Sequence, residues 1–431
     1  MSPRSSHPTL LVFLLSLFVS TSIAQAKVPP NATFQFKNEG YFGEFLYVEY
    51  GATYRFFSEI FVSSAPFTIC FYNTTPNAYT LALRMGRTDT RWMTLRWVWE
   101  ANRGNPVGEN ATFTFGGDGN LVLANADGRV AWQSNTANKG VVGFRLLPTG
   151  NMVLHNSKGN FVWQSFDYPT DTILVGQSLR VGGPNKLVSR LSEKENKDGP
   201  YSLVIESKGS MSLYYKSKTS PKPRLYYTSG NFVDINNVTF EFEEDVEAGA
   251  YFLRFNPYII ARTFYNASLT FIRLEMDGNI KLYTHNLKLV RVAFVLTYSF
   301  FDRETPRNED ECQLPSRCGT FGLCEDSQCV ACPTKNGLAG WSASCAPEKL
   351  TSCKPSNFHY YKIVGVDHFL CKYTSGEAIK ESACEKKCTA DCKCLGYFYN
   401  RETSSCWAAN ELRTLTKVAN STHVGFIKAP N

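Results

Sequence analysis

The chain has 431 residues, of which 43% are hydrophobic and 14% aromatic, enough for several domains with sizeable cores. Its formal net charge of +7 is spread along the sequence without a run of basic residues, so nothing indicates nucleic-acid binding. Glycine and proline are scattered throughout, which favours short strands joined by turns over long helices.

The N-terminus has the pattern of a secretory signal peptide. Arg4 and His7 precede the apolar run Leu10–Val19, and a small-x-small cleavage site follows at Ala24-Gln25-Ala26. The run is too short to span a bilayer, which needs about 20 apolar residues. We therefore expect residues 1–26 to be removed and the mature protein to be secreted to the extracellular space or cell wall, without a membrane anchor.

Six Asn-x-Ser/Thr triplets agree with export, because each is an acceptor for N-glycosylation. Glycans need exposed attachment sites, so these asparagines should lie on surfaces or in turns. The predicted acceptors are Asn31, Asn73, Asn110, Asn237, Asn266 and Asn420.

The first part of the mature chain contains an internal repeat. Gly119–Asn125 recurs almost unchanged as Gly150–Asn156, and each copy continues into Trp-Gln-Ser, at Trp132 and Trp163. Alternating apolar residues, a turn with glycine and an aromatic strand are typical of a β-hairpin. One hairpin cannot bury its own tryptophan, so such units must pack together. A divergent third unit ends at Trp99, and we expect the three tryptophans to share one core.

Three motifs in this region resemble the plant bulb-type, or curculin-like, mannose-binding lectin domain. They are Val98–Arg103, Asp118–Leu123 and Trp163–Thr172, of which the last reads Trp-Gln-Ser-Phe-Asp-Tyr-Pro-Thr-Asp-Thr. Their form is similar to that in kinase-less S-locus glycoproteins and in epidermis-specific secreted glycoproteins. The resemblance implies a mainly β protein in which residues 27–185 form a lectin domain, a three-sided β-prism.

In that family, a sugar site is written Gln-x-Asp-x-Asn-x-Val-x-Tyr on one strand. The alternation places the polar groups on one face, where they can bond adjacent hydroxyls of a mannose ring while Val packs against its carbon edge. The first repeat keeps Asp118, Asn120 and Val122, and the second keeps Asn151 and Val153. Because Asp-Gly-Asn also favours turns, a sugar contact and a structural role are both open.

Residues 195–303 return to strand patterns after the polar link Ser192–Gly199, and they resemble a second, degenerate prism. Within them the mannose motif recurs at Asp277, Asn279 and Tyr283. Two linked weak sites would bind more tightly than either alone. Over both prisms, strands are predicted at Phe67–Tyr72, Thr80–Met85, Arg96–Glu100, Tyr201–Ile205, Met211–Tyr215, Val238–Phe242, Tyr251–Phe255, Ile272–Met276 and Ile280–Tyr283.

All but one of the fourteen cysteines lie in the C-terminal part of the chain, which indicates a disulfide framework in an exported protein. Zinc is the alternative for Cys329-x-x-Cys332, but the partner motif is missing. An odd set of seven precedes the last six, so either one of the seven is free or one reaches Cys70; a buried, unreacted Cys70 is equally open. The seven are Cys312, Cys318, Cys324, Cys329, Cys332, Cys345 and Cys353.

Residues 306–353 resemble a short EGF-like module, and residues 354–431 resemble a PAN/apple domain. Glu377–Cys388 is predicted as an amphipathic helix with its cysteines on one face, followed by strands at Cys392–Tyr399 and around Cys406. PAN domains of this kind usually serve protein or sugar contacts, including self-association. The resemblance implies the disulfides Cys384–Cys406, Cys388–Cys394 and Cys371–Cys392.

No catalytic motif stands out, and the six histidines are dispersed, with His359 and His368 expected on the surface. We therefore expect no enzyme activity, cofactor or metal. Two functions without catalysis stand ahead of an enzyme, the third possibility. The first is a secreted lectin that binds mannose-type glycans of cell-wall or extracellular glycoproteins. The alternative is a protein–protein interaction or receptor-decoy glycoprotein whose sugar sites have degenerated.

Overall fold

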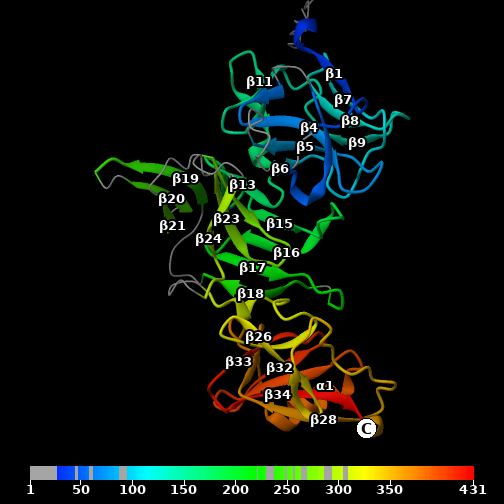
Figure 1. Ribbon diagram of the computed structural model, residues 1–431, viewed down its shortest axis with the longest axis vertical. Helices are drawn as coiled ribbons and strands as arrows, with labels where there is room; N and C mark the ends of the chain where they lie inside the picture. The colour runs from blue at the N-terminus through cyan, green and yellow to red at the C-terminus, as the bar shows by residue number, and fades with distance from the viewer. Residues whose placement is uncertain are drawn as a thin grey trace, which may run out of the picture.

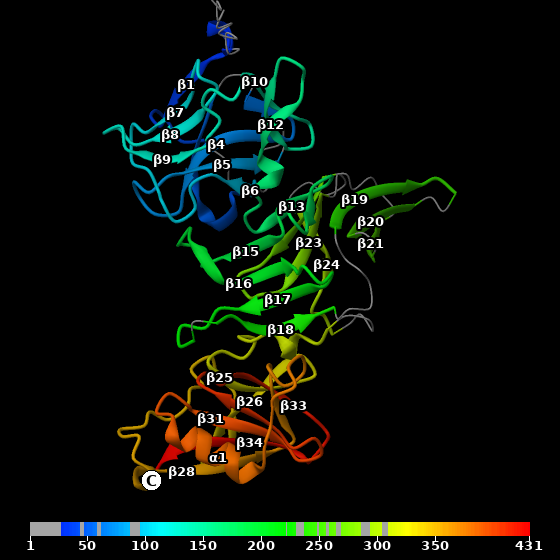
Figure 2. The same cartoon turned by 180° about the vertical axis from the view of Figure 1, so that it is seen from behind.

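The computed structural model describes residues 27–43, 47–57, 62–86, 95–220, 222–229, 237–247, 250–255, 258–263, 269–285, 294–303 and 309–431. These residues form strands, short 3-10 turns and one α-helix, which confirms the mainly β fold class. Figures 1 and 2 show three bodies stacked along the long axis, in blue to cyan, in green and in yellow to red. The predicted signal peptide and Asn266 lie outside the described residues. No helix in the described ranges is long and apolar enough to cross a membrane.

The first body, here the first prism, is built from three antiparallel sheets. The β8 sheet has the order β1 (Phe34–Lys37), β7 (Thr112–Phe115), β8 (Leu121–Ala124), β9 (Val130–Gln133). The β5 sheet has the order β2 (Thr53–Phe56), β4 (Phe67–Asn73), β5 (Thr80–Met85), β6 (Arg96–Glu100), with the short β3 (Ser63–Ser64) beside β4. The β11 sheet has the order β10 (Val141–Leu146), β11 (Met152–Asn156), β12 (Phe161–Gln164).

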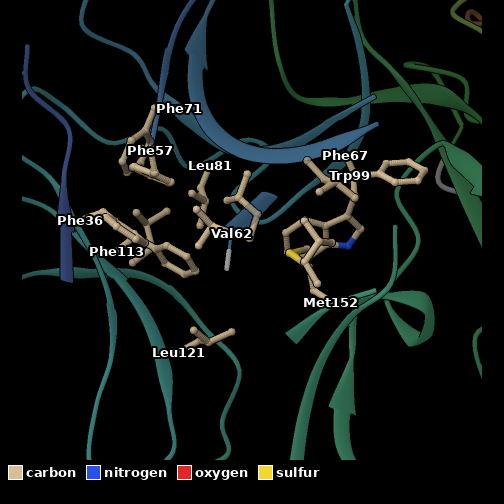
Figure 3. Packing of buried hydrophobic residues seen from close by; sticks show 14 of the residues in the cluster. Phe36, Phe57, Val62, Phe67, Phe71, Leu81, Trp99, Phe113, Leu121 and Met152 are labelled. Atoms are coloured by element: carbon tan, nitrogen blue, oxygen red, sulfur yellow. The ribbon is translucent and has the colours of Figure 1, made fainter. Parts of the chain in front are cut away.

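Each sheet contributes one tryptophan to a shared core. The ring centroids of Trp99 and Trp132 are 5.8 Å apart, those of Trp99 and Trp163 are 6.3 Å apart, and those of Trp132 and Trp163 are 5.9 Å apart. All three pairs meet edge to face, a favourable arrangement for aromatic rings. Phe, Leu and Met side chains from the three sheets belong to the same core, and Figure 3 shows some of them together with Trp99. The predicted tryptophan core is confirmed.

The second body, here the second prism, repeats this plan with three four-stranded sheets. The first has the order β13 (Thr172–Leu174), β22 (Thr270–Leu274), β23 (Ile280–His285), β24 (Phe294–Ser299). The second has the order β14 (Ser178–Arg180), β19 (Asn237–Asp245), β20 (Ala250–Phe255), β21 (Tyr258–Thr263) and projects sideways (Figures 1 and 2). The third has the order β15 (Lys186–Arg190), β16 (Asp198–Ile205), β17 (Met211–Tyr215), β18 (Arg224–Thr228).

Strand pairing places the division between the prisms earlier than the sequence suggested. β13 and β14 pair with β22 and β19, although both strands fall within the range predicted for the first domain. The polar link Ser192–Gly199 is the loop and strand start between β15 and β16, where Arg190 pairs with Asp198. We therefore propose that the second prism begins at Thr172.

The third body contains two five-stranded sheets and the helix α1 (Glu381–Ala390). One sheet has the order β27 (Gly337–Gly340), β26 (Gln328–Thr334), β25 (Phe321–Glu325), β33 (Arg413–Lys417), β29 (Val366–His368). The other has the order β28 (Phe358–Val364), β34 (His423–Pro430), β31 (Gly396–Asn400), β32 (Ser405–Ala409), β30 (Glu377–Ala378). Because β25 pairs with β33, strands of the predicted EGF-like and PAN/apple regions share one sheet.

Six disulfides hold this body together. They are Cys312–Cys324, Cys318–Cys329, Cys332–Cys345, Cys353–Cys392, Cys384–Cys406 and Cys388–Cys394. The last two agree with the pairs that the resemblance implied. The expected Cys371–Cys392 bond is wrong, because Cys353 reaches from the preceding module to Cys392 and leaves Cys371 a thiol. The seventh cysteine is thus neither free nor bound to Cys70, which is a buried thiol.

Buried ion pairs join the two prisms. Arg103 donates through Nη2 to Asp171 Oδ2 at 2.7 Å and through Nε to Glu100 Oε2 at 2.6 Å. Arg190 Nη1 lies 3.2 Å from Glu100 Oε1, and Arg273 Nε lies 3.9 Å from Asp171 Oδ1. All five side chains are at most 7% exposed. Glu100, Arg103 and Asp171 precede the second prism, whereas Arg190 and Arg273 belong to it. The Arg190–Glu100 and Arg273–Asp171 pairs therefore cross the junction.

Candidate functional site

The asparagine of the first mannose motif forms hydrogen bonds within its own hairpin. Asn120 is 6% exposed, and its Nδ2 donates to Gln133 Oε1 at 2.9 Å. Its Oδ1 accepts hydrogen bonds from Ser134 Oγ at 2.9 Å and from Thr136 N at 3.0 Å. The amide therefore ties the turn before β8 to the chain that follows β9, which is the structural role left open by the sequence.

Two other motif asparagines do the same. Asn151 is 5% exposed and donates to Gln164 Oε1 at 2.8 Å, while its Oδ1 accepts from Phe166 N at 3.3 Å. Asn279 is 1% exposed, donates to the Phe301 carbonyl oxygen at 3.0 Å and accepts from the Phe301 amide at 3.0 Å. The amides of the three asparagines thus bond the chain itself, and a sugar contact at these residues stays a prediction.

The second repeat presents neither predicted residue to a ligand. Val153 in β11 is fully buried, between Arg145 and Gln164 in the sheet register. Gln164 Nε2 donates to Asp167 Oδ2 at 3.0 Å. The expected contact between Val153 and a sugar is wrong in this arrangement, because the side chain has no exposed surface.

The motif in the second prism has its polar groups bonded to one another. Lys281 Nζ lies 3.0 Å from Asp277 Oδ2, and Asp277 Oδ1 accepts from Asn279 N at 2.8 Å. Tyr283 Oη donates to Glu275 Oε1 at 2.8 Å. Burial raises the pKa of Glu275 and that of Tyr283. A sugar would have to displace these internal partners, although the Asp277 pair is partly exposed and therefore weak.

The β8 sheet contains the mannose-motif strand whose outward side chains are accessible to solvent. The sheet register aligns Gln35, Thr114, Val122 and Gln133 in one row across its outer face. Both glutamines are exposed, and Thr114 and Val122 are half-buried. Asp118 is exposed in the turn that ends this hairpin, where its Oδ1 accepts from Asn120 N at 3.1 Å. We call these five residues the β8 face.

The β8 face combines a carboxylate, a hydroxyl and two amides with one apolar side chain. Such groups can donate to and accept from sugar hydroxyls while Val122 contacts carbon atoms. Sequence reasoning missed Gln35 and Thr114, because only strand pairing brings β1 and β7 beside β8. Gln133 stands in the repeated Trp-Gln-Ser, so the repeat contained a signal for it.

Most described glycosylation acceptors are at the surface. Asn31, Asn110, Asn237 and Asn420 are exposed, as expected. Asn73 differs, because it ends β4 with 8% exposure and its Oδ1 accepts from Thr53 Oγ1. The expectation of an exposed side chain is therefore wrong for Asn73.

Comparison with known proteins gives a consistent picture. A family model for D-mannose binding lectin matches residues 96–194. EP1-like glycoprotein 4 of Arabidopsis thaliana is 52% identical over 98% of this chain and 96% of its own length. Epidermis-specific secreted glycoprotein EP1 of Daucus carota is 52% identical over 83% of this chain and 98% of its own.

A more distant relative is a G-type lectin S-receptor-like serine/threonine-protein kinase of Arabidopsis thaliana, 26% identical over 77% of this chain and 38% of that protein. The similarity to the EP1-like proteins extends over all three bodies, whereas the lectin model covers the end of the first prism and the start of the second. The chain belongs to the family of EP1-like glycoproteins and carries a domain of the D-mannose binding lectin type.

Proposed function

We propose that the protein is a secreted, non-enzymatic lectin whose first prism binds mannose-type glycans through the β8 face. The observation that carries this proposal is the exposure of Asp118 and the partial exposure of Val122, whereas Val153 is buried and Asp277 is paired with Lys281. The signal-peptide pattern and the acceptor triplets support export. The name of the carrot relative, a secreted glycoprotein, points the same way.

Binding through this face is weak for a single sugar. Gly116 and Ala124 stand where the family motif has Gln and Tyr, and each lost hydroxyl contact forfeits about 1 kcal/mol. Gln35 and Gln133 offer amide groups in the same row and replace part of this loss. A glycoprotein that displays many mannose residues is therefore the proposed partner, in the cell wall or extracellular space. Self-association through the PAN/apple region, residues 354–431, would add avidity.

The test is a glycan array probed with protein whose own glycans have been removed. Asp118→Ala removes the exposed carboxylate of the β8 face, and Asp277→Ala is the matched control from the paired motif. We expect wild type and Asp277→Ala to bind mannose-type glycans and Asp118→Ala to bind them several-fold more weakly. Undiminished binding by Asp118→Ala would place recognition elsewhere.

The mannose motifs whose residues are buried or paired within the protein favour the second candidate function. Burial of Val153 and the Lys281–Asp277 and Tyr283–Glu275 contacts are what a chain whose sugar sites have degenerated would show. Such a protein would act through protein contacts of its C-terminal body. An array on which no glycan binds wild type would favour this alternative over the lectin.

A further inference from the structure

A cavity of about 510 Å³ opens to solvent where β2 begins and β4 ends in the first prism. Its lining combines the aromatic ring of Phe42 with the hydroxyl, amide and carboxylate groups of Thr53, Asn73, Asn77 and Glu109. The volume lies in the range of small-molecule sites, which likewise mix apolar surface with a few polar groups. No residue of the β8 face lines this cavity.

The carboxylate of Glu109 is held in one orientation. Arg55 donates to it through Nη1 at 2.6 Å and through Nη2 at 3.0 Å, and Tyr79 Oη donates to it at 2.5 Å. These hydrogen bonds lower the pKa of Glu109, so an ionised acceptor stands at the cavity wall. The Arg55 guanidinium carbon lies 4.5 Å from the centroid of the Phe42 ring. Because Arg55 balances Glu109, the wall has no unpaired charge.

Two amide groups at the lining retain unused donors. Asn73 accepts from Thr53 Oγ1 through Oδ1, and Asn77 accepts from the Glu109 amide through Oδ1 at 2.8 Å. Neither Nδ2 atom has a protein hydrogen-bond partner within the part of the chain that the structure describes. Asn77 is exposed and Asn73 is 8% exposed, and both residues line the cavity, so a bound ligand can accept from their Nδ2 groups. The cavity is therefore suited to a ligand with acceptor oxygens.

We propose that this cavity binds a neutral sugar ring. Sugar hydroxyls accept from Asn77 Nδ2 and donate to Glu109, while the exposed ring of Phe42 covers the apolar face of the sugar. Where Asn73 carries no glycan, its Nδ2 is a further donor. A charged ligand would have to compete with the Arg55–Glu109 ion pair. The site goes beyond the function proposed above, because it lies outside the β8 face and needs none of its residues.

Two sources can supply the sugar. Asn73 heads the acceptor triplet Asn73-Thr74-Thr75, and an N-glycan attaches through Nδ2, the atom that has no protein partner here. The first source is therefore the protein's own glycan at Asn73. The second is a glycan of another molecule. Thr75→Ala removes the triplet while keeping the Asn73 amide, so it separates the two.

The experiment has two arms. Glycopeptide mass spectrometry measures glycan occupancy at Asn73 and the rate of its enzymatic release, with the exposed acceptors Asn31, Asn110 and Asn420 as internal controls. Saturation-transfer NMR measures binding of methyl α-D-mannopyranoside, cellobiose and chitobiose to wild type and to Thr75→Ala. Phe42→Ala in each background tests the cavity, and Tyr41→Ala, whose side chain is 99% exposed, is its matched control.

If the sugar is the protein's own glycan, the glycan at Asn73 is released at least several-fold more slowly than the glycans at the control sites. In Phe42→Ala its release is faster than in the protein with Phe42. The external source predicts neutral-probe binding that Phe42→Ala weakens about tenfold, while Tyr41→Ala and Asp118→Ala leave it unchanged. The proposal fails if Asn73 glycans are released like the others and no neutral probe shows binding that depends on Phe42. Thermal unfolding confirms that each variant is folded.

Discussion

Asn120, Asn151 and Asn279 occupy the same position in three hairpins, and each bonds the chain through both ends of its amide. A sequence motif cannot separate this role from sugar binding, because both need an asparagine after Asp-Gly or Thr-Gly in a turn. What distinguishes them is the partner on the next strand. That partner becomes known only when strand pairing is known.

Replacing Asn151 with alanine removes hydrogen bonds from a buried hairpin. We expect Asn151→Ala to lower the free energy of unfolding by about 1–3 kcal/mol, because the Gln164 and Phe166 groups lose their partner. Asn160→Ala, at an exposed position of the same hairpin, should change it by less than about 0.5 kcal/mol. Urea unfolding measures both. Equal effects would contradict the structural role.

His368 gives a prediction for pH. It is 1% exposed rather than at the surface as expected from the sequence, and its Nδ1 accepts from Leu370 N at 3.3 Å while Nε2 lies 3.0 Å from the Glu411 carbonyl oxygen. Burial lowers the pKa of His368 from 6.5 to about 3. Between these values the unfolded chain takes up a proton that the folded chain does not, so stability is lost as the pH falls below 6.5.

We expect this loss to contribute up to about 1.4 kcal/mol per pH unit. His368→Gln keeps a donor and an acceptor but does not titrate, so its urea midpoint should fall less between pH 7 and pH 4 than that of wild type. The exposed His359→Gln should follow wild type. The same fall in all three proteins would show that His368 is not buried as a neutral side chain.

At the scale of elements, the alternation of apolar and polar residues and the amino-acid composition predicted where the strands lie. All nine strands predicted in the two prisms overlap strands of the structure, since alternating apolar residues bounded by turns fix a strand locally. The partners of these strands were less predictable. β13 and β14 pair with strands far along the chain, and β25 pairs with β33 from another predicted module. Such long-range pairing leaves no local pattern in the sequence.

Disulfide pairing shows the same limit. The bonds at Cys384 and Cys388 link α1 to nearby chain and agreed with the family resemblance, whereas Cys353–Cys392 joins two predicted modules. Spacing alone does not specify such a bond. The two remaining thiols, Cys70 and Cys371, lie apart from each other in different bodies.

Peptide mapping tests this assignment. A non-reducing digest should contain a peptide that links Cys353 to Cys392, and an alkylating reagent should label two thiols per chain after denaturation. Burial raises the pKa of Cys70 to about 12 and raises that of Cys371, so both should react slowly in the native protein. A digest with Cys371 linked to Cys392 would overturn the assignment, as would rapid native labelling of either thiol.

At the scale of the whole molecule, the motifs that identify the family also make the junction between its prisms. Glu100 and Arg103 belong to the motif Val98–Arg103, and Asp171 belongs to Trp163–Thr172. Glu100 and Asp171 form buried ion pairs with Arg190 and Arg273 of the second prism. In this protein, these motif residues therefore serve the junction between the prisms rather than a sugar contact.

Breaking this junction should be costly. Burial alone would raise the pKa of Asp171, but the charges of Arg103 and Arg273 outweigh it and lower the pKa. We expect Asp171→Ala to lose about 1.5–3 kcal/mol, because the buried Arg103 and Arg273 each lose one carboxylate partner while Arg103 keeps Glu100 and Arg273 keeps Glu49. Glu195→Ala, which removes an exposed pair with Lys197, should lose less than about 1 kcal/mol.

The pH dependence of this junction follows from the lowered pKa of Asp171. The stabilisation is present above the pKa of the unfolded carboxyl and is lost as the pH falls toward the folded value. Unfolding of wild type and Asp171→Ala should therefore converge in acid. A constant difference between the two proteins down to low pH would contradict the ionic role of Asp171.

The β8 face as the sugar-binding surface of the first prism is the central claim, and methyl NMR tests it most directly. Val122 is half-buried on that face, whereas Val153 is fully buried at the matching position of the second repeat. In protein with labelled valine methyl groups, titration with a mannose disaccharide should shift the Val122 signals and leave those of Val153 unchanged. Unchanged Val122 signals at saturating sugar, or a larger shift at Val153, would contradict the claim.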